Sequence, residues 1–362
     1  MHIGLTLPRK TSWPLERAGH TRLAFLDGWR GLAILCVLAG HAASGVSVLG
    51  QFSTFGVDLF FALSGRLMAD LLILRQQSIP VFLIRRFSRI VPALFVYIGL
   101  ILCITEVANL LTGGHTEIAI SAAAAAIFVH NYLPTADVNL AFEHCWSLAV
   151  EEHSYLALAA LAALSARRRG IFIWVATGIT LFATLNGFAL QHHVNAASQS
   201  VMWRSDVRAG SIFVSAAIYL MIVGAQRKRM PRWVCAVSPV SAALAVIAFA
   251  LPGMRPSLNL ALTSSLLALS VATLDHAHPA LLSLLKSRLL TSCGILSYSL
   301  YLWQQPFLIS ARESTMPGAS LLALGATVVM ALWSYHRIER PARLYLNARI
   351  TRVHEVPAAL AV

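Results

Sequence analysis

Long apolar runs, separated by short polar and basic segments, constrain the fold of this chain more than any other feature. A run of about 20 apolar residues crosses the hydrocarbon core of a bilayer as one helix. Because 57% of the residues are hydrophobic and only 12% are charged, the sequence predicts an all-α integral membrane protein. Eleven apolar runs are visible, at about 30–50, 53–74, 90–112, 117–133, 146–166, 171–190, 208–225, 235–252, 258–274, 291–311 and 318–336.

The basic residues between the runs orient them, because cytoplasmic loops of membrane proteins carry an excess of Lys and Arg. If all eleven runs crossed, the cluster at 167–169 and every later basic cluster would fall outside the cell. The run 117–133 is the weakest candidate, since it opens on Glu117 and is mostly alanine. We therefore predict ten transmembrane helices with both termini cytoplasmic, and an interfacial or re-entrant helix near 117–133.

The chain is predicted to form one transmembrane domain over 22–343, between cytoplasmic tails at 1–21 and 344–362. The first 28 residues lack the short apolar segment of a signal peptide, so the first run is predicted to be a retained span. No soluble domain is expected after the last run.

The formal charge of +13 is explained mainly by cytoplasmic anchoring of the basic clusters, and nucleic acid is not expected as a partner. The five cysteines are scattered without a CxxC pair. The sequence therefore predicts neither a disulfide framework nor a metal site.

Arg30 and His41 are eleven residues apart in the first run, which brings them to the same face of a helix with a rise of roughly 16 Å. This spacing places Arg30 at the membrane surface and His41 about halfway into the apolar layer. Ionisable side chains at such depth are costly and usually functional. We therefore treat both as candidate catalytic residues. The alternative for His41 is a packing histidine bonded to a neighbouring hydroxyl.

The second run carries Asp58, Ser64 and Arg66, of which Asp58 and Ser64 are candidate substrate-binding residues. Asp58 and Arg66 are costly in lipid, whereas the small Ser64 would allow a ligand or a helix to approach closely. Simple helix packing is the competing interpretation of Ser64.

Arg86 and Arg89 lie three residues apart at the start of the third run, so their side chains are neighbours on a helix. Two adjacent guanidinium groups suit a polyanionic ligand such as a nucleotide or pyrophosphate. The alternative interpretation is a cytoplasmic anchor for the span.

Trp146, Glu151 and Glu152 open the run at 146–166. Glu151 is expected about 7 Å below Trp146, at a depth like that of His41, so the carboxylate and the imidazole are expected to share proton transfer. Trp146 and Glu152 are candidate substrate-binding residues, although Trp146 alone also fits an interface anchor.

Three later motifs add polar residues to the predicted spans. Arg204 flanks Asp206, which fits either substrate binding or a local ion pair. Tyr298 lies among hydroxyls and amides that predict the wall of a polar cavity. The last run is expected to end at Pro341, because proline interrupts helices.

In their order and spacing these motifs resemble the acyltransferase-3 family of integral-membrane acyltransferases, which includes bacterial polysaccharide and lipopolysaccharide O-acetylases. The segments that carry the resemblance are 25–30 followed by His41, 60–65, 86–92, 146–152, 297–303 and 334–341.

The resemblance implies a multi-pass enzyme of a bacterial-type inner membrane. It would transfer an acyl group, commonly acetyl, from acyl-coenzyme A to a hydroxyl of a glycan or lipid-linked sugar. Acyl-coenzyme A would be a co-substrate, with no tightly bound cofactor. The family's functional positions correspond to Arg30, His41, Arg86, Arg89 and Glu151 here.

Two departures from the family pattern, Arg66 and Ser154, leave the shape of the pocket open. Whether His41 acts as a base or carries the acyl group is also open at this stage. The alternative function is a transporter or proton-coupled flippase that uses the same buried charges. The lack of an inverted repeat weighs against that alternative.

Overall fold

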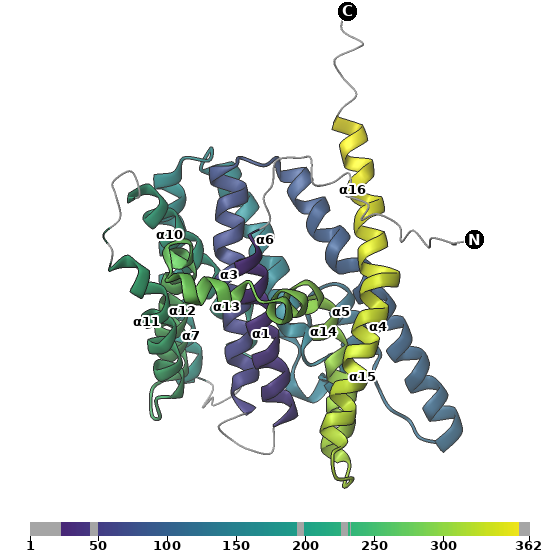
Figure 1. The fold of residues 1–362 in the computed structure, drawn as a ribbon. Helices are drawn as coiled ribbons and strands as arrows, with labels where there is room; N and C mark the ends of the chain where they lie inside the picture. Colours follow the sequence, from purple (N-terminus) through teal and green to yellow (C-terminus); the bar gives the residue numbers. More distant parts are fainter. Residues whose placement is uncertain (1–22, 44–49, 194–198, 226–230, 232, 355–362) are drawn as a thin grey trace, which may run out of the picture.

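A computed structural model of the chain describes residues 23–43, 50–193, 199–225, 231 and 233–354. Every regular element in this described part is helical, as the sequence predicts (Figure 1). The predicted tail at 1–21 lies outside the described residues. So do the basic residues at 9–22, 227–229 and 232, and the end of the second tail at 355–362.

Each of the ten runs that are predicted to cross corresponds to one helix of the described chain. These helices are α1 (Ala24–Ala42), α3 (Phe52–Ala69), α4 (Ile79–Thr112), α6 (Cys145–Leu164), α7 (Arg169–His193), α10 (Gly210–Ala225), α11 (Val234–Ala250), α12 (Pro256–Thr273), α14 (Arg288–Glu313) and α15 (Ala319–Ser334).

Shorter elements join or extend these helices. They are the π-helical turns η2 (Asp70–Leu74) and η7 (Tyr335–Glu339), the 3-10 turns η3 (His130–Tyr132), η4 (Thr135–Asp137), η5 (Leu140–Phe142) and η6 (Leu274–His276), and the helices α5 (Ala119–Ala126), α8 (Gln199–Trp203), α9 (Ser205–Arg208), α13 (Pro279–Leu285) and α16 (Arg340–His354).

Five helices among the described residues are long and apolar enough to cross a membrane, and the bent pair of α13 and α14 makes a sixth. The bend between α13 and α14 is 53°. This supports a multi-pass membrane protein. The count of ten spans and the side on which each terminus lies stay predictions. The five spans are Ile79–Thr112, Arg169–His192, Ser205–Gly224, Pro256–His276 and Ala319–Arg349.

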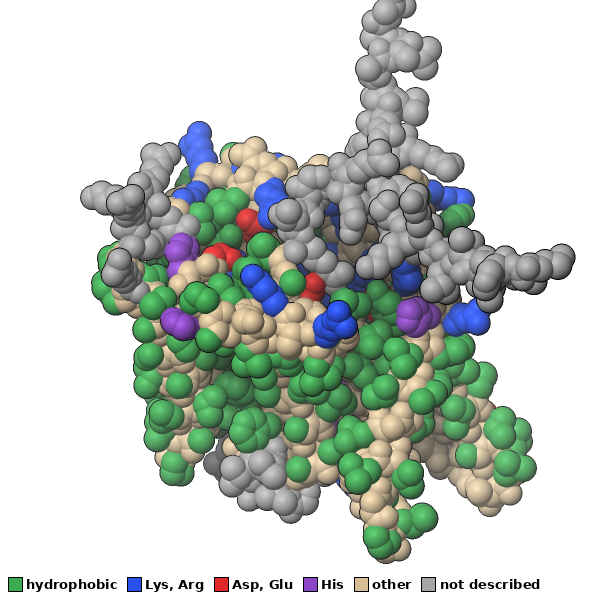
Figure 2. Space-filling view, viewed as in Figure 1, with side chains coloured by type: hydrophobic (Ala, Val, Ile, Leu, Met, Phe, Trp, Pro, Cys, Tyr) green, Lys and Arg blue, Asp and Glu red, His purple; other side chains and the backbone are tan. Residues whose placement is uncertain are grey.

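Large apolar side chains cover much of the outer surface. Leu110, Trp174 and Leu321 are 83%, 79% and 74% exposed. In the view of Figure 2, charged side chains gather across the upper half, while the lower half is mostly apolar. Helices satisfy their own backbone hydrogen bonds and can present such side chains to lipid.

The segment near 117–133 does not form a spanning helix. Its helix α5 has eight residues, which gives a length of about 12 Å, far below the roughly 30 Å of a bilayer core. The 3-10 turns η3 to η5 then lead to α6. This agrees with the exclusion of that run from the spans; its position relative to the interface stays a prediction.

Helix α1 begins six residues before the predicted run at 30–50, so His41 lies in its last turn rather than in its middle. The shift is explained by close packing, since Gly28 and Gly31 lie directly against the backbone of Leu285 and Leu290. The apolar side chains at the start of α1 are buried as well, since Phe25, Leu26 and Trp29 belong to the same core cluster as Leu285. Asp27 interrupts these apolar residues, which is why the hydropathy pattern places the start of the run later.

The prediction that Pro341 ends the last helix is wrong. Helix α15 continues through η7 into α16, which reaches His354, so residues 344–354 are helical. Pro341 follows the π-helical turn η7, where the α-helical hydrogen-bond pattern is already interrupted, so the missing N–H of proline does not end the helix. Helix α16 also packs on α4, where Ser88 donates a hydrogen bond to Asn347. Figure 1 shows α15 and α16 as one long rod beside α4.

Candidate active site

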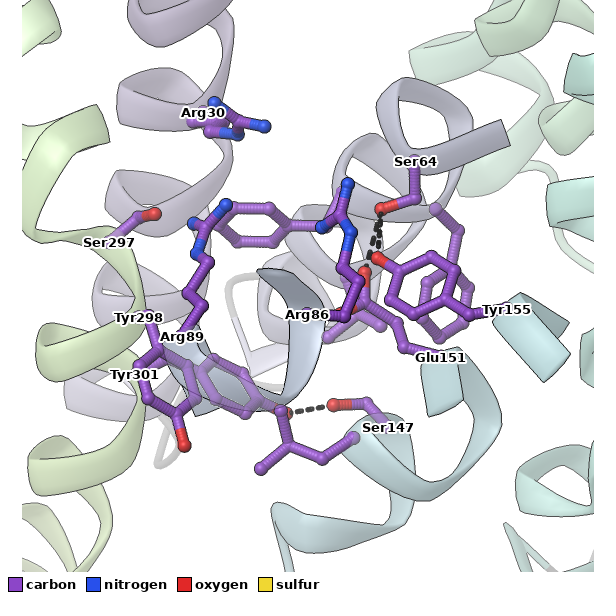
Figure 3. Close-up of a pocket in the computed structure, with 14 residues that line it drawn as sticks. Arg30, Ser64, Arg86, Arg89, Ser147, Glu151, Tyr155, Ser297, Tyr298 and Tyr301 are labelled. Carbon is purple, nitrogen blue, oxygen red and sulfur yellow. Dashed lines mark hydrogen bonds between the residues drawn. The ribbon is translucent and has the colours of Figure 1, made fainter. Parts of the chain in front are cut away.

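A cavity between α1, α3, α4, α6 and α14 gathers most of the predicted site residues. We call it the arginine cavity; its empty volume is about 580 Å³, including the space at its mouth. Five elements that are distant in sequence therefore contribute to one site, as Figure 3 shows. The predicted residues that line it are Arg30, Ser64, Arg86, Arg89, Glu151 and Tyr298.

Three guanidinium groups converge on the arginine cavity (Figure 3). Arg86 lies over the ring of Tyr155, with 4.7 Å between its central carbon and the ring centroid. Arg30 is held by Asp27 on the preceding turn, at 3.3 Å, and its side chain is 19% exposed. The lining has three arginines and one glutamate, a formal charge of +2. This arrangement suits a ligand with several negative charges.

Glu151 lies on the polar side of the arginine cavity. Its Oε1 accepts a hydrogen bond from Ser64 Oγ at 2.8 Å, and Ser64 Oγ also lies 3.0 Å from the hydroxyl of Tyr155. These contacts join α3 to α6. Ser64 is therefore a hydrogen-bonding residue of the cavity wall, not only a small packing residue.

His41 lines a second cavity, the histidine cavity, of about 450 Å³. Its ring nitrogen Nδ1 lies 2.7 Å from Oε1 of Gln304 on α14. Val57 and Tyr301 line both this cavity and the arginine cavity, so the two are adjacent. The hydroxyl of Tyr301 lies 2.6 Å from Ser147 Oγ, which fixes part of the shared wall.

A third cavity, the tryptophan cavity, is the largest of the three at about 1130 Å³. It shares Thr54, Trp146 and Trp203 with the histidine cavity. The rings of Trp146 and Trp203 are stacked, with centroids 5.7 Å apart and planes 7° apart. Aromatic faces of this kind suit the apolar faces of sugar rings as well as other flat surfaces.

Asp58 lines the tryptophan cavity, but its carboxylate is already paired. Its Oδ1 lies 2.7 Å from a guanidinium nitrogen of Arg208, and the two side chains are 2% and 4% exposed. Arg208 also lies over the ring of Trp146, at 5.4 Å from the centroid. Asp58 therefore orients one wall of this cavity through Arg208.

The structure does not bring His41 and Glu151 together. They line different cavities, because Ser64 holds Glu151 on the arginine side while His41 occupies the last turn of α1. The expected match in depth assumed that His41 lies halfway along the first span, whereas it lies in the last turn of α1. The two groups therefore line adjacent cavities and not one shared cavity.

Two predicted substrate-binding residues lie outside the three cavities. Oε1 of Glu152 is buried and has no hydrogen-bond partner among the described residues. Arg204 forms an ion pair with Asp206 at 2.9 Å and lies over the ring of Tyr132. The local ion pair that the sequence offered as an alternative is what the structure contains.

The two departures from the family pattern have structural explanations. Arg66 is buried against Asp275, at 2.6 Å, and it also donates to the carbonyl of Val271. Ser154 donates to the carbonyl of Val150 on its own helix. Neither residue lines the three cavities.

Sequence reasoning missed two residues of the site, Glu143 and Trp203, which both line the histidine cavity. Glu143 lies shortly before the motif at 146–152, and Trp203 directly precedes Arg204. An acidic or an aromatic residue next to such a motif is the sequence signal that could identify them. Within the described residues, no group of three or more His, Cys, Asp or Glu is suited to hold a metal ion.

Comparison with known proteins identifies one family. A family model described as an acyltransferase domain matches residues 23–336, which lie within the predicted domain at 22–343. The peptidoglycan O-acetyltransferase OatA of Listeria monocytogenes is 26% identical over 352 residues, covering 88% of this chain and 55% of the relative. A protein of Staphylococcus aureus strain COL, named a putative O-acetyltransferase, is 24% identical over 354 residues, with 88% and 57% covered.

A protein of Komagataeibacter xylinus, named a putative membrane-bound transacylase BcsY, is 27% identical over 357 residues. There the match covers 93% of this chain and 87% of the relative. The chain thus spans a little over half the length of the Listeria and Staphylococcus relatives. No solved structure matches it.

Proposed function

We propose, from the premise that this chain belongs to the acyltransferase domain family, that it is a membrane-bound O-acyltransferase. It moves an acyl group, acetyl in the simplest case, from acyl-coenzyme A to a hydroxyl of a cell-envelope or secreted carbohydrate. The name of the Listeria relative, a peptidoglycan O-acetyltransferase, supports a glycan acceptor.

The series of three adjoining cavities is the observation that carries this proposal. The arginine cavity binds the phosphates of the donor through Arg30, Arg86 and Arg89, since guanidinium groups form paired bonds with phosphate. The acyl end of the donor reaches His41 across the wall shared by the first two cavities. The acceptor enters through the tryptophan cavity, which adjoins the histidine cavity from the other side.

His41 supplies the reactive nitrogen, by one of two routes. In direct transfer, His41 removes the proton of the acceptor hydroxyl, whose oxygen attacks the thioester carbonyl. The carbon–sulfur bond breaks, and the coenzyme A thiolate takes the proton from His41. In the covalent route, the imidazole nitrogen attacks the thioester, the carbon–sulfur bond breaks and coenzyme A leaves as the thiolate. The acceptor hydroxyl then attacks the acyl-imidazole, the carbon–nitrogen bond breaks, and the hydroxyl proton neutralises the thiolate. Protein that keeps the acyl label after mixing with donor alone would identify the covalent route.

The proposed topology has ten spans and both termini on the cytoplasmic side of a bacterial-type inner membrane. The arginine cavity then faces the cytoplasm, where acyl-coenzyme A is found, and the tryptophan cavity faces outward. Arg30 precedes His41 by about 16 Å on α1. In this topology Arg30 lies toward the donor side of the membrane and His41 toward the acceptor side.

The test is an acyl-transfer assay with the purified protein in nanodiscs and acetyl-coenzyme A that carries a labelled acetyl group. We expect release of free thiol together with ester formation on a glycan, and the loss of both in His41→Ala. His115→Ala is the matched control, because the His115 side chain is 83% exposed, far more so than His41. Full turnover by folded His41→Ala would reject the role of His41. Substrate flux into liposomes without thiol release would favour the transporter instead.

A further inference from the structure

A chain of hydrogen bonds leads away from His41 and ends on a loop. The Nδ1 atom of His41 contacts Oε1 of Gln304, and Nε2 of Gln304 donates to Oε1 of Gln305 at 3.2 Å. The amide nitrogen of Gln305 donates to the carbonyl of Leu140 at 3.1 Å and to Oε2 of Glu143 at 3.2 Å. Gln304 and Gln305 are 0% and 2% exposed, so the protein itself must satisfy their amide groups.

The far end of this chain fixes its direction. A backbone carbonyl only accepts hydrogen bonds, so the amide NH₂ of Gln305, not its oxygen, faces Leu140. The oxygen of Gln305 then faces Gln304 and accepts from its NH₂ group. Gln304 is left with its oxygen toward His41, and an amide oxygen cannot donate.

The consequence for His41 is a defined position of its proton. Because Gln304 presents only an acceptor, Nδ1 of His41 must carry hydrogen to make the 2.7 Å bond. A neutral imidazole holds one ring proton, so the other nitrogen, Nε2, keeps its lone pair. A base or a nucleophile needs that lone pair.

We propose that Glu143, Gln305 and Gln304 are positioning residues that hold His41 as the Nδ1–H tautomer, with Nε2 basic and directed to the reaction. The proposal rests on the proposed role of His41 in acyl transfer. None of the three residues needs to touch the donor for this effect. Helix α14 also fixes the backbone of His41, since Arg312 donates to the carbonyl of His41 at 3.2 Å.

The carboxyl group at the end of this series of hydrogen bonds is half-buried and lies outside the spanning helices. Glu143 precedes α6 and lines the histidine cavity. Burial raises its pKa, while the guanidinium of Arg312 and the hydrogen bond from Gln305 lower it. Both the charged and the neutral carboxyl group offer an oxygen that accepts from Gln305, so the direction of the chain does not depend on this ionisation.

The decisive measurement is the ¹⁵N spectrum of the histidine side chains in the full-length protein, in nanodiscs above the pH at which the imidazoles titrate. The thirteen histidines are resolved by comparison with His41→Ala, which removes one signal pair. We expect the His41 signals of the Nδ1–H tautomer in the unaltered protein. Signals of the Nε2–H tautomer would overturn the proposal without any variant.

Two substitutions of nearly equal length then separate the tautomer from packing. Gln304→Met removes the acceptor; we expect a mixture of tautomers and a kcat lower by about 10–100-fold, with KM for acetyl-coenzyme A unchanged. Gln304→Glu restores an acceptor, so we expect the Nδ1–H tautomer, most of the turnover, and a kcat–pH profile shifted to higher pH. Asn186→Leu, which removes a half-buried amide outside the cavities, should change neither the spectrum nor kcat.

The positioning role of Gln304 and the acyl-transfer role of His41 are tested by different results. An unchanged tautomer ratio in Gln304→Met would reject the positioning role, whatever the enzyme does. Normal turnover in His41→Ala would reject the proposed function but leave the spectrum of the unaltered protein as it is. A KM that rises with unchanged kcat in Gln304→Met would also contradict the proposal, because it would place Gln304 in donor binding.

Discussion

The arginines at the start of α4 show how neighbouring side chains in one helical turn can differ in their surroundings. Arg86 and Arg89 are half-buried and line the arginine cavity, whereas Arg85 on the same helix is exposed and does not. Position on the helix therefore decides which of these side chains reach the cavity. Donor binding by Arg86 and Arg89, rather than anchoring of the span, stays a prediction.

Replacing Arg86 and Arg89 together by Gln should weaken donor binding and leave the chemistry at His41 nearly intact. Hydrogen bonds to charged groups contribute about 1.5–3 kcal/mol each, so we expect KM for acetyl-coenzyme A to rise at least tenfold, with a smaller change in kcat. Arg85→Gln is the matched control and should behave as the unaltered enzyme. Equal KM values for all three proteins would contradict the proposal that Arg86 and Arg89 bind the phosphates of the donor.

The pair of Asp58 and Arg208 should stabilise the fold much more than the exposed pair of Arg204 and Asp206. Breaking a buried pair costs about 3–5 kcal/mol, because one charge stays buried without a partner, whereas exposed pairs contribute about 0–1 kcal/mol. We expect Asp58→Ala to lower the unfolding temperature in detergent strongly and Asp206→Ala to lower it slightly. Similar losses would mean that the buried pair is hydrated.

At the scale of elements, the contact between α1 and α14 positions His41. Gly31 lies against the backbone of Leu290, and Gly294 lies against the carbonyl of Asp27. A methyl group at either glycine would push the two helices apart. The bond from His41 to Gln304 joins the same two helices, so its length depends on that close approach.

Gly31→Ala should therefore reduce both stability and turnover. Overpacking of this kind costs about 1–3 kcal/mol or more, and we expect the ester-forming activity to fall with it. Gly99→Ala in α4 is the control, because nothing lies within 4 Å of the added methyl group. Alanine is also the better helix former by about 0.5–1 kcal/mol, so Gly99→Ala should be neutral or stabilising. A tolerated Gly31→Ala would show that the two helices move apart freely.

The connection between α5 and α6 should lose stability in acid through His130. Burial lowers the pKa of His130 from 6.5 to about 4, so folding favours its neutral form. The free energy of unfolding that depends on neutral His130 is fully present above pH 6.5 and is lost as the pH falls toward 4. At pH 4 the loss amounts to on the order of 3 kcal/mol. Unfolding free energies measured from pH 7 to pH 4 should fall less steeply in His130→Gln than in the unaltered protein. Parallel curves would contradict this prediction.

At the scale of the whole molecule, the order of the helices follows from hydropathy, and the site follows only in part. Apolar runs predict helices because lipid leaves the backbone no other partner. The early start of α1 follows from tertiary packing, since its apolar side chains enter the core and Gly28 and Gly31 lie against the backbone of α13 and α14. Likewise hydropathy predicts which residues enter the membrane but not which cavity a side chain lines, so it could not separate Glu151 from His41. Gln304 contacts His41, and Glu143 contacts Gln305, only after the chain folds.

The predicted topology can be tested with single cysteines in a variant that lacks Cys36, Cys103, Cys145, Cys235 and Cys293. We expect a membrane-impermeant maleimide to label Gly113→Cys in intact cells, because the turn after α4 is predicted to lie outside. Lys286→Cys, between α13 and α14, should react only after the cells are opened. Labelling of Lys286→Cys in intact cells would overturn the ten-span arrangement.

Because Arg30 and His41 belong to one unbroken helix, the spacing between the proposed phosphate site and the proposed reactive nitrogen cannot adjust to the donor. Helix α1 thus holds the two side chains at a fixed separation of roughly 16 Å along its axis. A carrier whose anionic head and thioester are separated by a flexible arm of comparable length can contact Arg30 and His41 at the same time. A compact acyl phosphate, with its charge beside the carbonyl, can contact only one of them at a time.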